Sequence, residues 1–531
     1  MAHANAISSS SLVFFFFLCM CSFTFATPSV QENFLRCFSS HSSTPPTDFQ
    51  VIHVPNRPSN YTSVLQSSIQ NLRFLNTTAP KPLLIITPTN KSHVRASILC
   101  CRSHGLQLRV RSGGHDYEGL SYVSSYARPF VIVDLVNLRS ISLNLKRKTM
   151  LVQAGATIGE VYHKIANASN VLGFPAGICH TVGVGGHFGG GGIGTMTRKY
   201  GIAADNIIDA SLIDAEGRIR DRKSMGEELF WAIRGGGALS FGVVLEWKIR
   251  LVPVPPTVTV FTVSKTLEQG ATKLVEKWQS IAHEFPEDLF LRIIIQPKNG
   301  TQPGSRTVEV LFNCLFLGTV EKLLPLMNER FPDLGLNKTD CSEMPWIESV
   351  LYFYGLKSVD DLLDRGLQEK VYYKAKSDFL EKPISEIGLE GIWKRILEVN
   401  NMYMIIDPLG GKLSRIPSSK LPFPYRKRYM YNIQYVVRWN AGDDEKKNID
   451  WIRRLHEYLT PHVSQSPRGA YLNYRDLDLG VNKDGNVSYS AARVWGEQYF
   501  GANFERLARV KGVVDPTNFF IYEQSIPPLF G

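Results

Sequence analysis

The first half of the chain alternates short apolar runs with amphipathic stretches, a pattern typical of strands and helices that follow one another. A polar loop follows the first predicted helix, which ends at Ser40, so continuous regular structure is expected to begin at Pro80. The predicted strands are Pro82–Pro88, Leu106–Val110, Phe130–Leu138 and Met150–Ala154. The predicted helices are Val30–Ser40, Ser92–Ser103 and one that runs from Thr157, with Glu160 completing a capping box, to near Ser169.

Strand and helix patterns resume beyond a glycine-rich stretch that ends at Gly194. Ile207–Asp221 has the pattern of a hairpin that turns at Glu216 and Gly217. Glu227–Arg234 is a short predicted helix ended by three glycines, and Phe241–Val252 is a long predicted strand. The proline cluster from Pro253 to Pro256 then marks a domain boundary.

Longer alternating runs after the prolines predict a sheet covered by helices. Leu274, Trp278 and Ile281 mark the buried face of one helix, a second helix follows Thr319, and the last helix spans Ala491–Val510. The predicted strands are Thr257–Val263, Leu289–Gln296, Arg306–Leu317 and Tyr429–Trp439. Together these patterns predict an α+β protein with two domains.

The N-terminus has the features of a secretory signal peptide. Residues 11–26 form an apolar run, and Thr24 and Ala26 stand where small residues precede a cleavage site. The run is short for a membrane span, and no later stretch is apolar enough for one. Secretion predicts surface glycosylation at the Asn-X-Ser/Thr sites. These begin at Asn60, Asn76, Asn90, Asn167, Asn299, Asn337 and Asn486.

The cysteines predict a disulfide and no metal site. No C-x-x-C spacing occurs among the six cysteines that follow the signal. A bridge from Cys37 to either Cys100 or Cys101 would tie the N-terminal helix to the first sheet, and it suits an oxidising compartment.

The formal net charge of +11 does not indicate a nucleic-acid partner, because the cations are scattered along the chain. Only short clusters occur, such as Lys146–Lys148 and Arg426–Arg428. A solvated basic surface of this kind can still adhere to acidic polymers such as wall pectin.

Two glycine-bearing stretches hold the candidate chemistry, Arg111–Tyr117 and Cys179–Gly194. Glycine at this density lets the backbone turn at positive φ or lie close to a ligand, and successive backbone N–H groups can bind a pyrophosphate. A flexible linker would be rich in Ser and would lack Cys and His. Each stretch carries a side chain, His115 or Cys179, that can attack an electron-poor isoalloxazine ring.

Other enzyme classes lack their motifs in this sequence. There is no G-x-S-x-G elbow, no H-E-x-x-H, no P-loop lysine and no Rossmann fingerprint. A thiol dyad of Cys179 with His180 or His187 remains open. Taken singly, His115 would be a structural histidine and Cys179 a small buried hydrophobe. Together, beside glycine loops, they indicate a covalently held flavin.

The chain resembles the plant berberine bridge enzyme-like oxidases of the vanillyl-alcohol-oxidase flavoprotein superfamily, which include the cannabinoid-acid synthases. The resemblance covers nearly everything after the signal. It rests on segments such as Asn33–Cys37, Arg111–His115, Phe174–Cys179, Arg198–Gly201, Ala204–Asn206, Glu228–Gly237, Tyr431–Tyr435, Trp495–Gly501 and Glu523–Pro528. It implies FAD held by two bonds, from His115 to the 8α carbon and from Cys179 to C6, and a Cys37–Cys100 disulfide.

The resemblance also implies a domain plan. Residues 1–26 would be the signal peptide, 27–77 an N-terminal segment tied by the disulfide, and 78–253 an FAD-binding domain of two subdomains. Residues 254–465 would form the antiparallel substrate domain, and 466–531 would return to the FAD domain.

The resemblance further assigns candidate residues to the site. Residues expected around the cofactor are His115, Cys179, Arg111, Ser112, Gly113, Gly114, Asp116, Tyr117, Gly177, Thr181, Val182, Gly183, Gly186, His187, Gly190, Gly194, Asn473 and Asn518. Tyr200, Gln434, Tyr471 and Tyr474 match active-site positions of various members, and Arg292 and Arg438 are candidate cations from the second domain. Tyr200 or Tyr474 can act as a base only if its phenolate is stabilised, and surface positions are the alternative for Arg292 and Arg438.

Val182 matches the oxygen-gating position of the family, where Val accompanies oxidases. Other positions depart from the family pattern and bear on substrate choice. His180 stands where proline is usual, and Gly189 and Ile193 replace a Ser and an aromatic residue. Asn432 and Gln434 leave no carboxylate base on their strand. Ile521 and Tyr522 also differ from the usual pair.

The function implied is a secreted oxidase that moves hydride from a plant metabolite to FAD, which O2 reoxidises to give H2O2. The expected substrate is a small phenolic, prenylated phenolic or alkaloid, with oxidative cyclisation as one outcome. The alternatives are a non-redox cyclase on the same FAD-containing fold, a carbohydrate oxidase and an inactive defence protein. A monomer is expected, in the apoplast or cell wall or alternatively in the vacuole.

Overall fold

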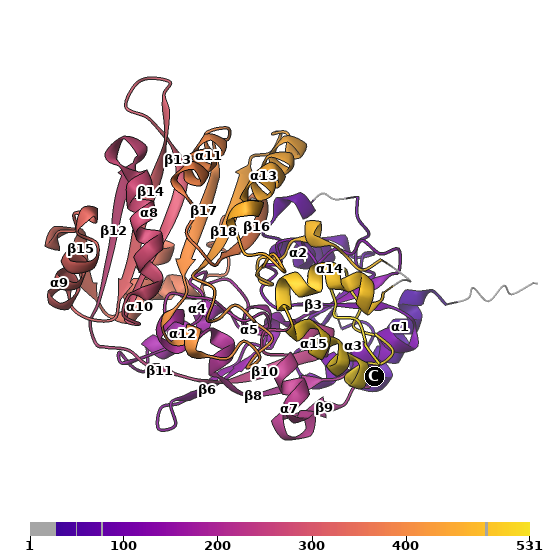
Figure 1. The fold of residues 1–531 in the computed structure, drawn as a ribbon. Coiled ribbons are helices and arrows are strands. Elements are labelled where there is room, and N and C mark those ends of the chain that lie inside the picture. The colour runs from indigo at the N-terminus through magenta and orange to yellow at the C-terminus, as the bar shows by residue number, and fades with distance from the viewer. Residues whose placement is uncertain (1–27, 49, 76–77, 484–486, 531) are drawn as a thin grey trace, which may run out of the picture.

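The computed structural model describes residues 28–48, 50–75, 78–483 and 487–530, so the predicted signal peptide lies outside the described residues. Two small sheets lie beside a larger one of seven strands (Figure 1). We call the two small sheets with their helices the two-sheet part, and the other the large sheet. The expected α+β class is confirmed. Within the described residues, no helix has the length and apolarity needed to cross a membrane.

The first small sheet is built on three parallel strands. Its strand order is β1-β2-β4-β3, and β1 joins antiparallel at the edge. The expected polar loop before Pro80 is wrong in part, because it contains β1 and the helix α2, whose Tyr61 and Leu65 are buried. The strands are β1 Ile52–His53, β2 Leu84–Ile86, β3 Gln107–Arg111 and β4 Phe130–Asp134, and the helices are α1 Val30–Ser42, α2 Pro58–Ser67 and α3 Lys91–Ser103.

The second small sheet is antiparallel, in the order β5-β6-β10-β8-β9. The predicted hairpin is confirmed, and its turn lies between β8 and β9. The helix after it starts earlier than predicted and bends at Gly226, where φ is 71°. The strands are β5 Ile141–Asn144, β6 Thr149–Gln153, β8 Ile207–Ile213, β9 Ile219–Arg220 and β10 Val243–Arg250, and the helices are α4 Ile158–Ala166, α5 Val184–Gly189, α6 Thr197–Tyr200 and α7 Arg222–Ala232. A separate pair joins β7 Leu172–Gly173 to β11 Val252–Pro253.

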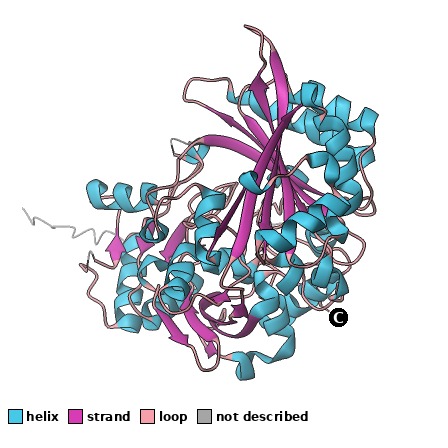
Figure 2. Cartoon of the chain, turned by 90° about the vertical axis from the view of Figure 1, so that its left-hand side faces the viewer, coloured by secondary structure: helices cyan, strands magenta, loops and turns pink. Residues whose placement is uncertain are grey.

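The large sheet is antiparallel throughout, in the order β15-β12-β14-β13-β17-β18-β16. Alternate residues of its central strands pack in a core with α8, α11 and α13, and Figure 2 shows helices gathered on one face of the sheet. The opposite face is therefore free to meet the two-sheet part. The strands are β12 Val258–Thr266, β13 Leu289–Asn299, β14 Arg306–Phe316, β15 Cys341–Met344, β16 Tyr372–Leu380, β17 Met402–Pro408 and β18 Tyr431–Trp439. The helices are α8 Ala271–Ile281, α9 Val320–Arg330, α10 Trp346–Tyr354, α11 Glu386–Ile396, α12 Gly411–Arg415 and α13 Glu445–Leu459.

The C-terminal segment returns to the two-sheet part. The single helix predicted over Ala491–Val510 is wrong, because two helices, α14 Tyr489–Phe500 and α15 Asn503–Val514, are separated at Gly501, whose φ of 53° ends the first. Arg506 pairs with Glu228 of α7, and the buried Lys511 donates to the Ser240 carbonyl and pairs with Asp515. These contacts hold the yellow helices of Figure 1 against the two-sheet part.

A buried cluster of charges joins the large sheet to both other parts of the molecule. Lys374 and Lys376 of β16 pair with Asp476 from the C-terminal segment, and Lys374 also pairs with Glu118 from the loop after β3. Asp478 completes the cluster. Burial alone would raise the pKa of Asp476, but the two lysines lower it overall, so the carboxylate stays charged. Removing one partner would leave a buried charge uncompensated.

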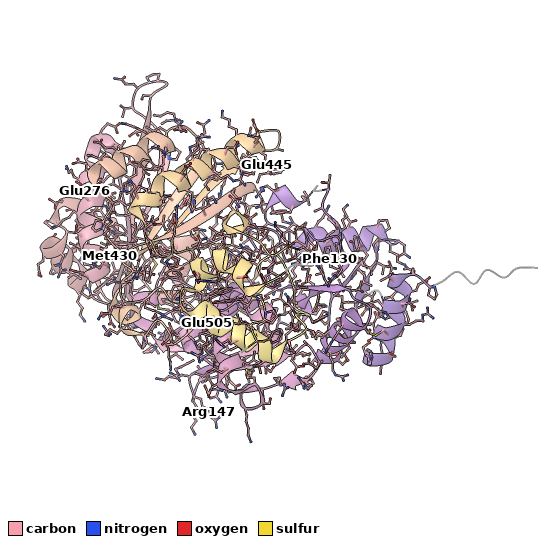
Figure 3. The ribbon with its side chains drawn as sticks, turned by 45° about the vertical axis from the view of Figure 1, so that its right-hand side comes forward. Phe130, Arg147, Glu276, Met430, Glu445 and Glu505 are labelled. Carbon is pink, nitrogen blue, oxygen red and sulfur yellow. A yellow bond between two sulfur atoms is a disulfide. The ribbon has the colours of Figure 1, made fainter. Side chains whose placement is uncertain are left out.

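The basic clusters noted in the sequence do not form one patch. Lys146–Lys148 lie at the exposed tip of the β5–β6 hairpin, where Arg147 projects outward (Figure 3). Arg426 instead is buried and pairs with Asp205, and Arg428 pairs with Glu381.

The predicted glycosylation asparagines within the described residues lie in exposed positions. These are Asn60, Asn90, Asn167, Asn299 and Asn337. Asn76 and Asn486 lie outside the described residues. Glycosylation stays a prediction.

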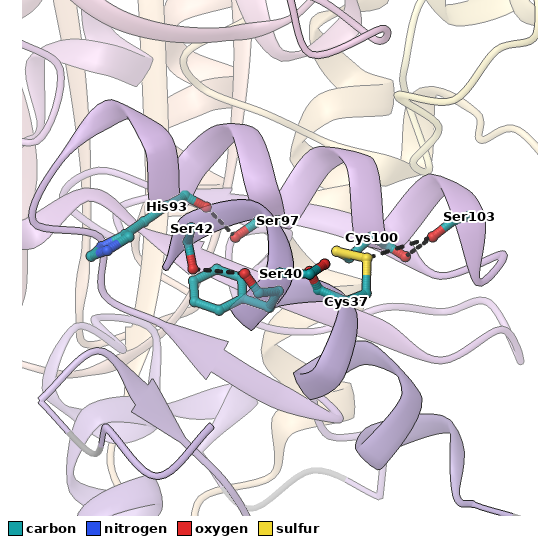
Figure 4. The surroundings of a disulfide bond; sticks show 8 residues. Cys37, Ser40, Ser42, His93, Ser97, Cys100 and Ser103 are labelled. Carbon is teal, nitrogen blue, oxygen red and sulfur yellow. Dashed lines mark hydrogen bonds between the residues drawn. A yellow bond between two sulfur atoms is a disulfide. The ribbon is translucent and has the colours of Figure 1, made fainter. Parts of the chain in front are cut away.

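The predicted Cys37–Cys100 disulfide is present and joins α1 to α3 (Figure 4). Cys101 is the next residue of α3, and it is buried as a free thiol. The choice between the two follows from helical spacing, which turns neighbouring side chains about 100° apart.

Replacement of Cys100 by Ser is expected to lower the free energy of unfolding by about 4 kcal/mol, because the bridge closes a long loop of the unfolded chain. The two cysteines are 63 residues apart. Denaturant unfolding measures the change, with Cys341→Ser, a half-buried free cysteine, as the matched control. A Cys100→Ser protein as stable as the parent would contradict the expectation.

Candidate active site

A cavity of about 700 Å³ lies between the two-sheet part and the large sheet. Its walls come from the loop after β3, the glycine-rich stretch around α5, the uncovered face of the large sheet and the segment around Tyr471–Arg475. Four parts of the sequence that are far apart therefore build one site. A cavity of this size is typical of cofactor and small-molecule sites.

The glycines bring two loops into backbone contact at the cavity wall. A Cβ on Gly113 would lie 2.3 Å from the Gly183 nitrogen, and one on Gly183 would lie 2.1 Å from Ser112 Oγ. Gly114 has a φ of 73°, in the left-handed region. Further along, a Cβ on Gly190 would overlap Asn473 Oδ1 at 1.9 Å. These glycines are therefore required by the close packing between loops.

Gly186 differs, because a Cβ added there would meet no atom within 4 Å. It lines the cavity on α5 and has no positive φ. The missing side chain thus leaves space in a cavity wall that also carries Gly113, Gly114, His115 and Cys179. Bare backbone beside two nucleophilic side chains fits an FAD.

His115 and Cys179 face the same cavity and share hydrogen-bond partners. Thr181 Oγ1 lies 2.9 Å from His115 Nε2 and 2.5 Å from Gln368 Oε1, and Cys179 Sγ lies 3.1 Å from that same amide oxygen. Burial, with the nearby His180, lowers the pKa of His115 to about 3. The imidazole is therefore neutral at physiological pH and keeps a lone pair for bond formation. Burial raises the pKa of Cys179, and its hydrogen bonds with Tyr354 and Thr181 oppose the rise.

The two other histidines of the stretch have structural partners. His187 Nε2 accepts a hydrogen bond from the Gly177 N–H at 3.0 Å, and burial lowers its pKa to about 4. His180 is fully buried, its ring packs edge-on against Tyr354 with 4.8 Å between centroids, and its Nε2 lies 3.1 Å from the Asp364 carbonyl. Neither is within the hydrogen-bond shell of Cys179, so the geometry gives no support to a thiol dyad.

Alternate residues of the large sheet form the facing wall. Because side chains of a strand alternate between faces, every second residue of three neighbouring strands reaches the cavity. These are Phe290, Arg292, Ile294 and Gln296 on β13, Tyr403, Ile405 and Asp407 on β17, and Gln434, Val436 and Arg438 on β18. The intervening residues lie in the core under the helices.

Asp407 supplies a buried carboxylate in this wall. The residue is 9% exposed, and its Oδ1 has no hydrogen-bond partner. Burial raises the pKa of Asp407 to about 6, although the positive charge of Arg292 opposes the rise. Arg292 itself is held by Asn313, whose Oδ1 accepts from its Nε at 2.8 Å, and it lies over the Phe353 ring. A carboxyl group that titrates near neutrality in a cavity is suited to proton transfer.

Tyrosines line the rest of the substrate side. Tyr117 stacks on Tyr474 with 5.7 Å between ring centroids, and the Gln434 amide donates to the Tyr117 hydroxyl at 2.5 Å. Burial raises the pKa of Tyr474 well above its usual value, and the charge of Asp407 adds to the rise. Its phenolate is therefore disfavoured. The Tyr471 hydroxyl accepts from the N–H groups of Gly192 and Ile193 and anchors the C-terminal segment.

Most sequence-predicted site residues line the cavity, and four do not. Arg111 is buried against Asp134, the Tyr200 hydroxyl donates to the Pro253 carbonyl, and Asn518 lies beyond the lining with a φ of 53°. Thr181 does not line the cavity but contacts His115, which does. Arg292 and Arg438 both line the cavity; Arg292 is buried, whereas the Arg438 side chain is 35% exposed and pairs with Glu369.

Comparison with known proteins places these features in a family. A family model described as an FAD binding domain matches residues 82–222, and one described as berberine and berberine like matches residues 470–527. Berberine bridge enzyme-like 23 of Arabidopsis thaliana is 53% identical over 95% of both chains. The chain belongs to the plant berberine bridge enzyme-like family.

Other members show the range of reactions in this berberine bridge enzyme-like family. The chain is 51% identical to O-acetylstemmadenine oxidase of Catharanthus roseus, over 94% of both chains. It is 45% identical to the solved grass-pollen protein Phl p 4, which is described as a glucose dehydrogenase, with a TM-score of 0.89 over 94% of this chain and all of that one. A variant of that protein with one Ile-to-Val change is described as a glucose oxidase. Membership makes the chain an FAD-dependent oxidoreductase.

Sequence reasoning missed several residues that a berberine bridge enzyme-like cavity uses here. Gln368, Tyr354, Tyr403 and Asp407 all line it. Tyr403, Ile405 and Asp407 do alternate on one strand, but that strand had not been predicted. Gln368 lies in an irregular loop, where no periodic signal exists. The absence of a carboxylate on β18 is correct, and the neighbouring β17 provides one.

Replacement of Gly186 by Val is expected to leave the fold stable and to reduce the FAD retained per chain at least tenfold, because the new side chain fills open cavity space. Gly183→Ala is the contrasting variant, and overlap with Ser112 should lower its free energy of unfolding by about 1–3 kcal/mol. Flavin absorbance per chain and thermal unfolding separate the two effects. Full flavin content in Gly186→Val would contradict the cavity assignment.

Proposed function

We propose that this chain is an FAD-linked oxidase that takes hydride from a carbon bearing a hydroxyl group on a small molecule. The carrying observation is Asp407, a buried carboxylate that lines the cavity and whose Oδ1 has no hydrogen-bond partner. Bound FAD supplies the hydride acceptor and passes the electrons to O2. The residues described above supply the proton acceptor and the orientation of the substrate.

Asp407 is the proposed general base. Removal of hydride from an alcohol carbon leaves a carbonyl only if the O–H proton also departs, so a proton acceptor must stand near the hydroxyl. The charge of Arg292 keeps part of the Asp407 population ionised in spite of burial. Tyr474, Tyr471 and Tyr117 then position the substrate, because burial raises their phenol pKa values above the ordinary value and disfavours the phenolate that a base would need. No catalytic role is proposed for Tyr200, which hydrogen-bonds to the Pro253 carbonyl.

The lining combines aromatic walls with polar groups on the sheet. Tyr354, Tyr373 and Tyr403 offer ring faces, while Arg292, Gln296, Gln434 and Arg438 offer hydrogen bonds. This combination suits a ring substrate that carries several hydroxyl groups, such as a saccharide, and also an aromatic alcohol of the phenolic class. The glucose activity described for Phl p 4 supports the carbohydrate side. Oxidative cyclisation of a prenylated phenolic requires the same hydride and proton transfers.

Two further proposals concern the cofactor. His115 and Cys179 form the two covalent links to FAD, supported by their position in one cavity and the neutral state of the imidazole. Val182 lines the same cavity and, by the family pattern, admits O2. Secretion as a glycoprotein monomer to the apoplast, cell wall or vacuole also remains a proposal, supported by the disulfide and the exposed acceptor asparagines.

A second candidate is oxidation of a tertiary amine, favoured by the 51% identity to O-acetylstemmadenine oxidase. Hydride loss next to a tertiary nitrogen leaves an iminium ion and requires no proton acceptor, so Asp407 separates the two reactions. The non-redox cyclase and the inactive defence protein are the remaining alternatives.

The test of the proposal is a panel of saccharides, aromatic alcohols and tertiary-amine alkaloids, scored for H2O2. Anaerobic mixing with the best compound should bleach the flavin. Product formed while the flavin stays yellow would mean a non-redox cyclase, and no turnover of any compound by fully flavinylated protein would favour an inactive protein.

Replacement of Asp407 by Asn is expected to lower kcat/KM for an alcohol substrate about 10²–10⁴-fold, because the base is lost. In the parent protein kcat/KM should rise with pH through about 6, since the deprotonated form is active above its pKa. The variant should lose that rise. Asp450→Asn, on the exposed side of α13, is the control. An unchanged pH profile in Asp407→Asn would exclude this residue as the base.

A further inference from the structure

Gln368 lies where the two proposed attachment residues meet, although it belongs to a distant loop. It precedes β16, and its amide oxygen is 3.1 Å from Cys179 Sγ and 2.5 Å from Thr181 Oγ1. Thr181 Oγ1 in turn is 2.9 Å from His115 Nε2. One amide oxygen thus connects the thiol directly, and the imidazole through one hydroxyl.

The direction of these hydrogen bonds follows from what each atom can donate. An amide oxygen only accepts, so both the Cys179 thiol and the Thr181 hydroxyl donate to Gln368. The Thr181 hydroxyl has a single proton, and it donates this proton in its hydrogen bond to Gln368. The Thr181 oxygen therefore accepts a hydrogen bond from His115 Nε2–H. In the neutral imidazole, Nδ1 then carries the lone pair. The position of Gln368 therefore sets the tautomer of His115 from two hydrogen bonds away.

The loop that carries Gln368 is fixed at several points. The buried His180 ring holds the Asp364 carbonyl and packs on Tyr354. Arg365 donates to the Gly155 carbonyl and pairs with Glu160 on α4. A Cβ on Gly159 would lie 2.2 Å from the Leu362 carbonyl oxygen, so α4 is in close contact with the turn that leads into the loop of Gln368. His180, which replaces the usual proline of the family, thereby helps to anchor the loop.

We propose that Gln368 is a positioning residue for covalent flavin attachment, holding the Cys179 thiol directly and fixing the His115 tautomer through Thr181. The inference rests on the proposed attachment of FAD through both residues. In each link, a C–H bond of the isoalloxazine is replaced by a C–N or C–S bond. The carbon loses one proton, and His115 Nε2 or the Cys179 thiol loses another. The electron pair reduces the isoalloxazine, and O2 takes it with two protons to give H2O2.

Peptide mass mapping of the purified holoproteins tests this proposal, because it reports each link separately and needs no substrate. Thr181→Val should lose the His115 link in most chains and keep the Cys179 link. Gln368→Leu should reduce both links at least tenfold, with FAD still bound non-covalently. His180→Ala should give a partial loss of both links. Leu367→Ala, at the exposed neighbouring position, is the matched control and should keep both.

Total flavin content and thermal unfolding, measured on the same samples, exclude general damage to the fold. If Gln368→Leu retains both links at the parental level, the proposal is overturned. If Gln368→Leu instead loses links only together with its FAD and its stability, the role is structural and the proposal also fails. A parent protein with no covalent flavin would refute the attachment through His115 and Cys179. The proposed oxidase function would then be tested separately, by measuring substrate oxidation by that protein.

Discussion

The backbone contact between Gly113 and Gly183 is the constraint on which the site depends. It brings the end of a parallel strand and the start of a short helix so close that no side chain fits between them. His115 lies two residues beyond one partner, and Cys179 lies four residues before the other. The separation of the two nucleophiles is thus set by main-chain packing, which leaves little room for movement in a close-packed interior.

The second constraint is electrostatic. Lys374 and Lys376 face Asp476 and Glu118 out of water, where a missing partner is costly. This cluster fixes the large sheet, the loop after β3 and the C-terminal segment relative to one another. Asp407 and Tyr474 reach the cavity from two of these three parts, so their spacing also depends on the cluster.

The sequence predicted those parts of the fold that have a periodic signal. The strands β13, β14 and β18 alternate clearly, and His115 and Cys179 were marked by their glycine neighbours. β16 and β17 were not predicted, because β16 carries the charged Lys374 and Lys376 at positions that are buried and paired, and β17 is a short apolar run that ends at Asp407. The division of Ala491–Val510 into two helices depends on one positive φ at Gly501. Gln368 could not be predicted from the sequence, since its proposed role depends only on contacts with Cys179 and Thr181, which precede it by 189 and 187 positions.

The return of the C-terminal segment has a consequence for the order of synthesis. A chain that grows from its N-terminus contains both nucleophiles after about a third of its length, whereas Tyr471, Asn473 and Tyr474 emerge near the end. Until then the glycine-rich wall lacks the Asn473 side chain that packs against Gly190, Lys376 lacks its carboxylate partners, and Lys374 has only Glu118. The complete cavity is therefore a property of the finished chain, and a nascent or truncated chain would expose the glycine-rich wall to the surrounding medium.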